Sequence, residues 1–362
     1  MDKCIVFTGG GSGGHVMPAL TLIQRLCSES SGPGDDGVEI QYIGSFDGIE
    51  RELVSQQHIP YHAISTGKLR RYLSLQNFYD IFKIIAGWAG ALRLLWRLPK
   101  KRTLVFSTGG FVSVPVVVAA KCLSLPVFIH EQTTRIGLAN RIASRFADKV
   151  FISFEDSRPF FPAAKTHHSG YPLRKECFSK EISKVELDGQ TLNDADLPIV
   201  FITGGGNGSK LINDFFKPAI KTLTEKFIIV HQVGKLFYSE FTVFKSKHYF
   251  PLAFIGAEMI DLMKLATVVI SRAGAGTVSE LMALNKASIF IPLKIAQHNE
   301  QFHNAKEAER RVGSKVIEED QLSAMEPAQL LEDFVNAPNV STHIQTEDAC
   351  PYLIEQIHDA LK

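Results

Sequence analysis

The sequence predicts an α/β protein of two doubly wound domains, each built on a parallel sheet. Short runs of β-branched residues alternate with helical stretches along the chain, which is typical of βαβ units. One pattern of strand, glycine-rich turn and helix occurs twice, as CIVFTGGGSGGH and as IVFITGGGNGSK. With 362 residues the chain is long enough for two domains of ordinary size, each with its own core.

The elements of the two domains follow from this alternation. In the first domain we expect strands at residues 4–7, 40–43, 104–106, 127–130 and 150–153, and helices at 18–27, 114–123 and 138–146. In the second we expect strands at 199–203, 227–232, 268–271 and 287–291, and helices at 211–221, 277–284 and 300–309. The predicted domains cover residues 1–170 and 171–345, and a last helix within 346–362 is expected to pack back on the first domain.

The composition is that of a soluble globular protein, with 45% hydrophobic and 21% charged residues. The five cysteines are odd in number and widely spaced, which argues against a disulfide framework or a zinc site and for a reducing cytosol. No stretch approaches the roughly 20 apolar residues of a spanning helix, and the first apolar run is too short for a signal peptide. Residues 1–165 carry 19 basic and 13 acidic side chains, so this half can meet an anionic membrane or ligand.

Two glycine-rich loops are the first candidate sites. Glycines permit a tight turn and let backbone N–H groups reach an anion at the positive end of a helix. The first loop ends at His15, which is either a catalytic group or an ordinary histidine at a helix start. A dinucleotide fingerprint would need an acidic residue at the end of the next strand, which reads YIGSFD. The second loop contains Gly206 and Asn207, and two phosphate-type loops favour a nucleotide-sugar enzyme.

The segment SRAGAGTVSE follows a predicted strand and leaves two interpretations of Glu280 open. The carboxylate can bind both ribose hydroxyls of a nucleotide, or it can form a capping box with Thr277. Amide side chains in the later segment QHNEQFHNA suit sugar hydroxyls. The chain has no D-x-D motif, and Arg174 with two helix N-termini can stabilise a pyrophosphate without a metal.

Residues 81–96 have the periodicity of an amphipathic helix followed by basic residues. This helix either packs on the sheet as an ordinary core helix or lies in the interface of a membrane. In the second case, the apolar face would comprise Ile84, Ile85, Trp88, Leu92 and Trp96.

These motifs, taken in order, closely resemble the MurG family of bacterial transferases, within glycosyltransferase family 28. The match includes GGGSGGHVMPAL, GKLRRYLSLQNF, STGGFVSVP, HEQTTRIGLANRIA, GYPLR, GGGNGS, SRAGAGTVSEL and QFHNA. The resemblance implies a GT-B fold of two Rossmann-like domains. It also implies inverting transfer of N-acetylglucosamine (GlcNAc) from UDP-GlcNAc to the C4 hydroxyl of undecaprenyl-pyrophosphoryl-MurNAc-pentapeptide, for peptidoglycan synthesis and cell division.

The resemblance further implies that no cofactor or metal is needed and that nucleic acid is not a partner. The protein is expected to lie peripherally on the anionic inner leaflet, at the cytoplasmic side of the bacterial cell membrane. His15 and Glu131 are the candidates for the catalytic base, and the choice between them stays open. The first loop, with Ser12, Gly13 and Gly14, is expected to face the acceptor. The residues expected to hold the donor are Arg174, Ile255, Ala275, Gly276, Thr277, Val278, Ser279, Glu280 and Gln301.

Three places depart from the family pattern. Thr133 replaces a common asparagine, Phe111 replaces a tyrosine, and Gly206-Asn207 replace a serine and its neighbour in the second loop. Thr133 still lies in the expected acceptor site, and Gly206 and Asn207 in the expected phosphate site. Two alternatives therefore remain open, namely a transferase that glycosylates another membrane lipid and a non-catalytic subunit that binds a sugar nucleotide.

Overall fold

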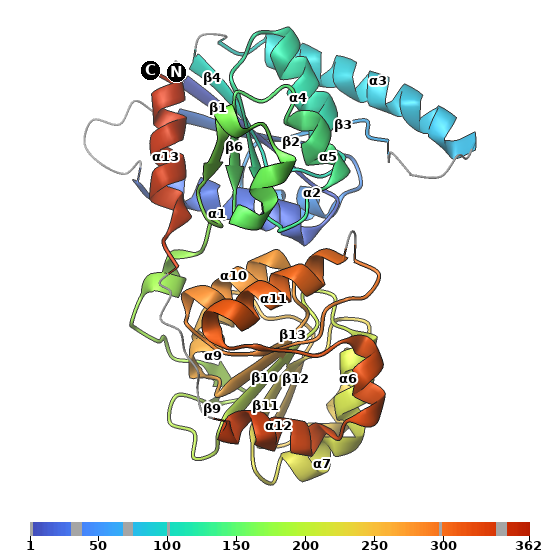
Figure 1. Cartoon of the computed structure of the whole chain (residues 1–362), viewed down its shortest axis with the longest axis vertical. Coiled ribbons are helices and arrows are strands. Elements are labelled where there is room, and N and C mark those ends of the chain that lie inside the picture. Colours follow the sequence, from blue (N-terminus) through green and yellow to red (C-terminus); the bar gives the residue numbers. More distant parts are fainter. Residues whose placement is uncertain (1–2, 30–37, 68–74, 100–101, 297–298, 338–345) are drawn as a thin grey trace. The chain divides into compact units, whose positions relative to one another are not determined.

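The computed structural model describes residues 3–29, 38–67, 75–99, 102–296, 299–337 and 346–362 (Figure 1). The chain forms two compact units. Unit 1 comprises Met1–Leu173 together with Asp348–Lys362, and unit 2 comprises Arg174–Glu347.

A seven-stranded parallel sheet forms the centre of unit 1, in the strand order β3-β2-β1-β4-β5-β6-β7. Phe7 of the central strand pairs with Tyr42 on one side and with Phe106 on the other. From β1 the sheet therefore extends to one side through β2 and β3 and to the other side through β4 to β7. The strand order thus reverses beside β1, and the loops after β1 and β4 are neighbours. The strands are β1 (Lys3–Thr8), β2 (Val38–Ser45), β3 (Tyr61–Ile64), β4 (Thr103–Ser107), β5 (Val127–Glu131), β6 (Lys149–Ile152) and β7 (Thr166–His168).

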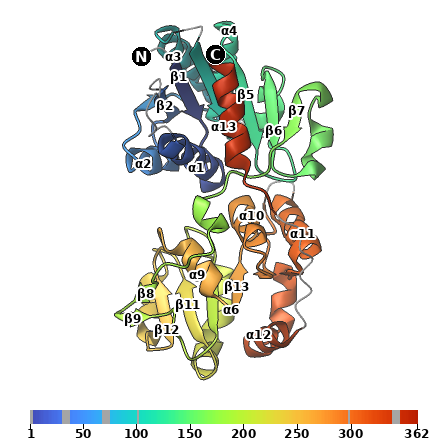
Figure 2. The same ribbon diagram turned by 90° about the vertical axis from the view of Figure 1, so that its left-hand side faces the viewer.

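Two hydrophobic cores cover the two faces of this sheet. Alternate residues of β1 serve them, because Val6 belongs to one core and Phe7 to the other. Leu353 and Ile357 of the last helix belong to the same core as Phe7, and Figure 2 shows this helix, α13, against the sheet of unit 1. The helices of unit 1 are α1 (Gly13–Glu29), α2 (Ile49–Ser55), α3 (Leu75–Trp96), α4 (Ser113–Cys122), α5 (Leu138–Ala143) and α13 (Ala349–Ala360).

Unit 2 repeats this arrangement with a six-stranded parallel sheet in the order β12-β11-β10-β13-β14-β15. The strand order reverses beside β10, where the loops after β10 and β13 are neighbours. The strands are β10 (Ile199–Thr203), β11 (Ile228–Gln232), β12 (Tyr249–Leu252), β13 (Val268–Ser271), β14 (Ile289–Phe290) and β15 (Lys315–Val316), and β8 (Glu186–Leu187) pairs with β9 (Gln190–Thr191) as a separate hairpin. The helices are α6 (Lys210–Phe216), α7 (Ile220–Leu223), α8 (Tyr238–Phe241), α9 (Met259–Leu265), α10 (Ala275–Ala283), α11 (Glu300–Val312) and α12 (Pro327–Asn336).

The prediction of two doubly wound α/β domains is confirmed, and each predicted strand is present within a few residues of its expected bounds. The pattern missed β3, β7, β8, β9, β12 and β15, which are short or, like β12 with Pro251, carry a proline at a sheet edge. The single helix expected at 211–221 is wrong. α6 ends at Phe216, and a separate short 3-10 helix, Lys217–Ala219, follows, because Pro218 cannot donate a helical hydrogen bond.

Candidate functional site

The loop after β1 lies at the strand-order reversal of unit 1, where ligands of doubly wound sheets bind. The Gly10 N–H donates to the Gly109 carbonyl at 3.2 Å, which joins this loop to the one after β4. Gly110 has a φ of +85°, and a Cβ there would lie 2.1 Å from the Gly10 carbonyl oxygen. Glycine is therefore required for this approach. Ser12 and Gly14 are exposed on the loop, and Gly13 is half-buried.

His15 lies half-buried in the first turn of α1. Its Nδ1 is 3.0 Å from Ser12 Oγ, and its carbonyl accepts a hydrogen bond from Thr108 Oγ1 at 2.6 Å. Burial lowers the pKa of His15 below its usual value, while a hydrogen bond with the Gly10 backbone and the charge of Glu50 oppose this shift. A histidine with a lowered pKa is neutral at pH 7, so this ring can accept a proton.

Glu50 is a buried carboxylate at this loop that the sequence analysis missed. It lies in the first turn of α2, is fully buried, and accepts the Gly11 N–H at 3.1 Å. The Ser45 N–H donates to its other oxygen at 3.0 Å. An acidic residue just beyond the second strand of a doubly wound domain was the available signal.

Glu131, the second candidate for the base, is the last residue of β5 and is buried. Thr133 donates to one carboxylate oxygen through its hydroxyl at 2.8 Å and its N–H at 3.1 Å, and Asn140 donates to the other oxygen at 3.0 Å. Burial raises the pKa of Glu131, and the hydrogen bonds from Asn140, Thr133 and Gly137 oppose the rise. Both oxygens are thus occupied by the protein, which suits a carboxylate that positions Thr133 better than one that receives a substrate proton.

The loop after β10 has the corresponding place in unit 2. Gly205 and Gly208 have φ values of +82° and +74°, and a Cβ on Gly208 would lie 1.9 Å from the Val233 carbonyl oxygen. Gly206 and Asn207 form the exposed tip of the loop. The loop closes on the N-terminus of α6, where Arg272 Nε donates to Ser209 Oγ at 3.1 Å. Arg272 therefore links the loops after β10 and β13.

Gln232, which the sequence analysis also missed, ties Ile255 to the same loop. It is fully buried at the carboxyl end of β11, and its Nε2 donates to the Gly205 carbonyl at 2.8 Å. Its Oε1 accepts the Ile255 N–H at 3.0 Å. The backbone of Ile255 is therefore held in a defined place relative to the glycine loop. A polar residue at the carboxyl end of a predicted strand was the available signal.

The helix that carries Glu280 begins earlier than expected. α10 starts at Ala275, with Gly274 as an N-cap that makes no side-chain hydrogen bond. The capping-box interpretation of Glu280 with Thr277 is therefore wrong, because the extended backbone of Gly274 (ψ 145°) starts the helix and leaves Glu280 in its second turn. The first N–H groups of α10 have no partner within the helix, which is typical of a site for anions. Three side chains of this turn are buried, namely Ala275, Val278 and Ser279, whereas Gly276 and Thr277 are half-buried.

Glu280 pairs with Arg174 inside unit 2. Arg174 donates to Glu280 Oε1 through Nη2 at 2.6 Å and through Nε at 3.1 Å. Burial raises the pKa of Glu280, and the charge and hydrogen bonds of Arg174 oppose the rise. The structure thus places a cation and a carboxylate beside the N-terminal turns of α10. Within the described ranges, no group of three or more His, Cys, Asp or Glu side chains could hold a metal ion.

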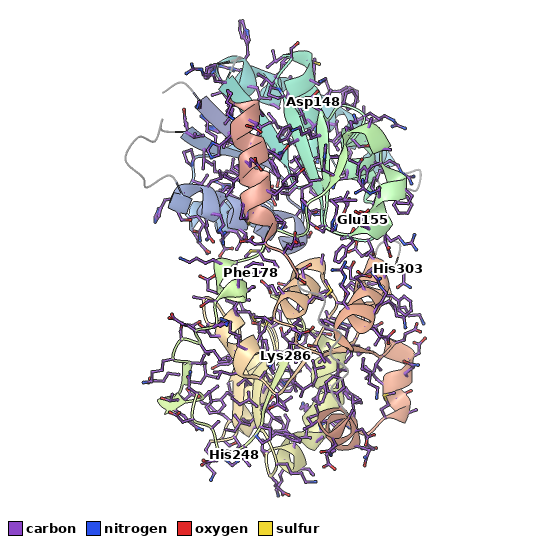
Figure 3. All side chains as sticks on the ribbon, turned by 60° about the vertical axis from the view of Figure 1, so that its left-hand side comes forward. Asp148, Glu155, Phe178, His248, Lys286 and His303 are labelled. Carbon is purple, nitrogen blue, oxygen red and sulfur yellow. The ribbon has the colours of Figure 1, made fainter. Side chains whose placement is uncertain are left out.

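The helix α11 lies beside α10 in Figures 1 and 2 and carries Gln301. Gln301 Oε1 accepts the Leu293 N–H at 3.0 Å, so its carbonyl is used within the protein. The buried Asn304 donates to the Ala273 carbonyl at 3.3 Å and so supports the turn before α10. His303 is labelled on the same helix in Figure 3. Gln297 and His298, part of the predicted amide segment, lie outside the described residues.

The apolar residues of α3 lie in two different environments. Trp88 and Leu92 pack against the core of unit 1, and Ile84 is half-buried. Ile85 and Trp96 are 54% and 67% exposed. The core interpretation thus holds for part of the helix, while its contact with a membrane stays a prediction. The exposed apolar residues are Ile81, Phe82, Ile85 and Trp96, which we call the α3 outer face.

Lys100 and Lys101, two of the basic residues expected after this helix, lie outside the described residues. None of the helices that the structure describes combines the length and the apolar character needed to cross a bilayer.

Comparisons with known proteins cover both units. Residues 5–152 match the glycosyltransferase family 28 N-terminal domain, and residues 199–352 match the glycosyltransferase family 28 C-terminal domain. The chain is 43% identical over 323 residues to a protein of Lachnoclostridium phytofermentans, covering 89% of this chain and 87% of the relative. That relative is named UDP-N-acetylglucosamine–N-acetylmuramyl-(pentapeptide) pyrophosphoryl-undecaprenol N-acetylglucosamine transferase.

A protein of Clostridium tetani with the same name is 39% identical over 325 residues, covering 89% of this chain and 87% of the relative. Among solved structures, the crystal structure of MurG from Acinetobacter baumannii matches with a TM-score of 0.69 and 25% identity, covering 99% of both chains. The predicted GT-B fold is confirmed by this likeness and by the two parallel sheets. Because the matched domains and relatives span both units, the chain belongs to glycosyltransferase family 28.

Proposed function

We propose that this protein transfers GlcNAc from UDP-GlcNAc to the C4 hydroxyl of undecaprenyl-pyrophosphoryl-MurNAc-pentapeptide. The observation that carries the proposal is the 43% identity over most of the chain to a transferase whose name specifies this donor and this acceptor. The structure supports it because each unit has a glycine loop at its strand-order reversal, the place for a phosphate-bearing ligand.

UDP-GlcNAc binds unit 2 in this proposal. The Ile255 N–H is already engaged by Gln232, so its carbonyl is the group that accepts the N3–H of uracil. Glu280 accepts hydrogen bonds from the ribose hydroxyls, and its partner Arg174 then serves the pyrophosphate. The first N–H groups of α10 and the exposed tip at Gly206-Asn207 supply further donors. Gln301 contacts the sugar through Nε2, because its Oε1 is held by Leu293.

The acceptor binds the loop after β1, at Ser12, Gly13 and Gly14. The neutral imidazole of His15 takes the proton of the C4 hydroxyl as the new glycosidic bond forms. The bond between the anomeric carbon and UDP breaks at the same time, with inversion. Arg174 and the N-terminus of α10 stabilise the charge that develops on UDP. Glu131 orients Thr133 and Asn140 on the acceptor side, since both of its oxygens accept hydrogen bonds from the protein.

The α3 outer face holds the protein on the cytoplasmic side of the cell membrane. Its aromatic and aliphatic side chains enter the lipid interface. The exposed Arg93 on the same helix and Arg97 directly after it meet anionic head groups. The protein therefore reaches its lipid-linked acceptor as a peripheral protein. Trp88 and Leu92 are not part of this contact, because they pack against the core.

The test is incubation of the purified protein with UDP-GlcNAc and a synthetic lipid-linked MurNAc-pentapeptide, with diacylglycerol in a parallel reaction. We expect UDP release and a disaccharide product with the first acceptor only. Product formed from diacylglycerol alone would assign the protein to another lipid acceptor, the alternative that Thr133 raises. Binding of UDP-GlcNAc without turnover on either acceptor would identify a non-catalytic subunit.

A further inference from the structure

The loop that carries Ser12 and His15 is supported by one buried side chain from α2. We propose that Glu50 is a positioning residue, which holds the backbone of this loop in the path that presents His15 to the acceptor. The inference rests on the proposed function of His15, although the contacts of Glu50 do not depend on it.

The contacts of Glu50 come from two different strand ends. Its Oε2 accepts the Gly11 N–H of the loop after β1, and its Oε1 accepts the N–H and the hydroxyl of Ser45 at the end of β2. A Cβ on Gly10 would lie 2.5 Å from the Glu50 carboxyl carbon, so the loop backbone lies directly against this group. The carboxylate thus anchors the loop at Gly11, four residues before His15, in a stretch where glycines would otherwise leave the backbone free.

Two tyrosines complete the enclosure of Glu50. The Tyr42 hydroxyl, from β2, donates to the Gly9 carbonyl at 2.8 Å, and the Tyr61 hydroxyl, from β3, donates to the Ser45 carbonyl at 2.5 Å. The titratable groups that interact with the Glu50 charge are His15, Tyr42 and Tyr61, and Arg51 interacts with Tyr61. Within this group, the Glu50 charge favours the protonated form of His15 and thereby raises its pKa.

An acidic residue after the second strand of a doubly wound domain commonly binds a ribose hydroxyl. Here that position faces inward, and both carboxylate oxygens are occupied by backbone and hydroxyl donors. Glu50 therefore binds the loop and not a ligand, and the exposed side of the loop remains available to the acceptor. A role in stability alone would predict that its loss changes unfolding and leaves the kinetics of the folded protein intact.

The test compares Glu50→Gln with Glu52→Gln, which neutralises an exposed carboxylate two residues further along α2. The amide of glutamine keeps the shape but turns an NH2 group toward a donor. We expect kcat/KM for the lipid acceptor to fall by about tenfold or more, as for the loss of a hydrogen bond to a charged group, while UDP affinity stays the same. We also expect the acid limb of the pH profile of kcat/KM to move to lower pH, because removal of the negative charge lowers the pKa of His15. Glu52→Gln should match the unchanged protein in all three measurements.

Glu50→Asp is the second variant, and it carries the test if Glu50→Gln does not fold. The aspartate keeps the charge, but its side chain is one methylene shorter and cannot reach Gly11 and Ser45 at the same time. We therefore expect kcat/KM for the acceptor to fall, while the acid limb of the pH profile moves less than in Glu50→Gln. Folded variants with unchanged acceptor kinetics and an unchanged pH profile would overturn the inference. The proposed function is tested separately by turnover of the unaltered protein, so active wild type with unaffected Glu50 variants refutes only the role of Glu50.

Discussion

The side chains of His15 and Glu131 differ in their exposure and in whether their polar atoms are available to a substrate. His15 is half-buried with a lowered pKa, whereas Glu131 is buried and receives hydrogen bonds on both oxygens. We therefore expect His15→Ala to lower kcat by roughly a hundred- to ten-thousand-fold, the range of general base catalysis. Steady-state kinetics with the lipid acceptor measures this, and calorimetry should show that UDP affinity is retained. If Glu131→Gln instead loses kcat to that extent at unchanged acceptor KM while His15→Ala stays active, the assignment is reversed.

Glu280 is held in place by Arg174, and its position in the second turn of α10 gives it no role in capping. Glu280→Gln should weaken UDP binding by about 1.5–3 kcal/mol, as expected when a charged hydrogen-bonding group is lost. Titration calorimetry with UDP measures the change. The matched control is Glu318→Gln, which alters a carboxylate at the start of a 3-10 helix of the same unit. Equal UDP affinity in Glu280→Gln and the unaltered protein would exclude the ribose assignment.

At the scale of the element, some apolar residues of α3 pack on the core of unit 1 and others form the exposed α3 outer face. Ile85→Ser together with Trp96→Ala removes apolar surface from the α3 outer face, so sedimentation with anionic liposomes should fall while the free energy of unfolding stays nearly constant. Leu95→Ala on the same helix is the control, because Leu95 is fully buried. It should cost about 2–5 kcal/mol of stability and leave liposome binding of the folded fraction intact. Unchanged sedimentation of the double variant would exclude membrane docking through this face.

The elements that the sequence predicts well are those that periodicity determines locally. The buried strands β1 and β10 are short apolar runs rich in β-branched residues, and the two glycine loops follow directly from them. The missed residues act through tertiary contacts instead. Glu50 meets Gly11 across 39 positions and Gln232 meets Gly205 across 27, and no local pattern encodes either pair. Likewise, the periodicity of α3 identifies an apolar helix but cannot say which of its apolar residues face the core.

At the scale of the whole molecule, each unit contains a fully buried histidine at the last position but one of a strand, His130 in β5 and His231 in β11. Burial lowers the pKa of His130 in unit 1 to about 4 and that of His231 in unit 2 to about 3. The unfolded chain binds a proton near pH 6.5 and the folded chain does not, so stability is complete above pH 6.5 and is lost as the pH falls toward 4. The expected slope is about 1.4 kcal/mol per pH unit for each histidine.

Urea unfolding between pH 7.5 and 4.5 checks this expectation. His231→Gln should reduce the pH dependence of the free energy of unfolding of unit 2, since glutamine does not titrate. His58→Gln replaces an exposed histidine and should leave the slope as it is. A His231→Gln variant that keeps the full slope would show that other groups govern the acid sensitivity.

The assignment of α13 to unit 1 has a consequence for synthesis on the ribosome. The core beneath this helix includes Phe7 and Phe151, and Tyr352 lies edge-on against Phe151 with ring centroids 6.0 Å apart. The whole of Arg174–Glu347 is translated between the two parts of unit 1. At about 5–20 residues per second this takes roughly 10–35 seconds. During that interval one face of the nascent sheet lacks one of its covering helices, while unit 2, a single continuous segment, can already fold. The growing chain therefore presents an apolar surface that chaperones can bind, and the first unit made is the last to be completed.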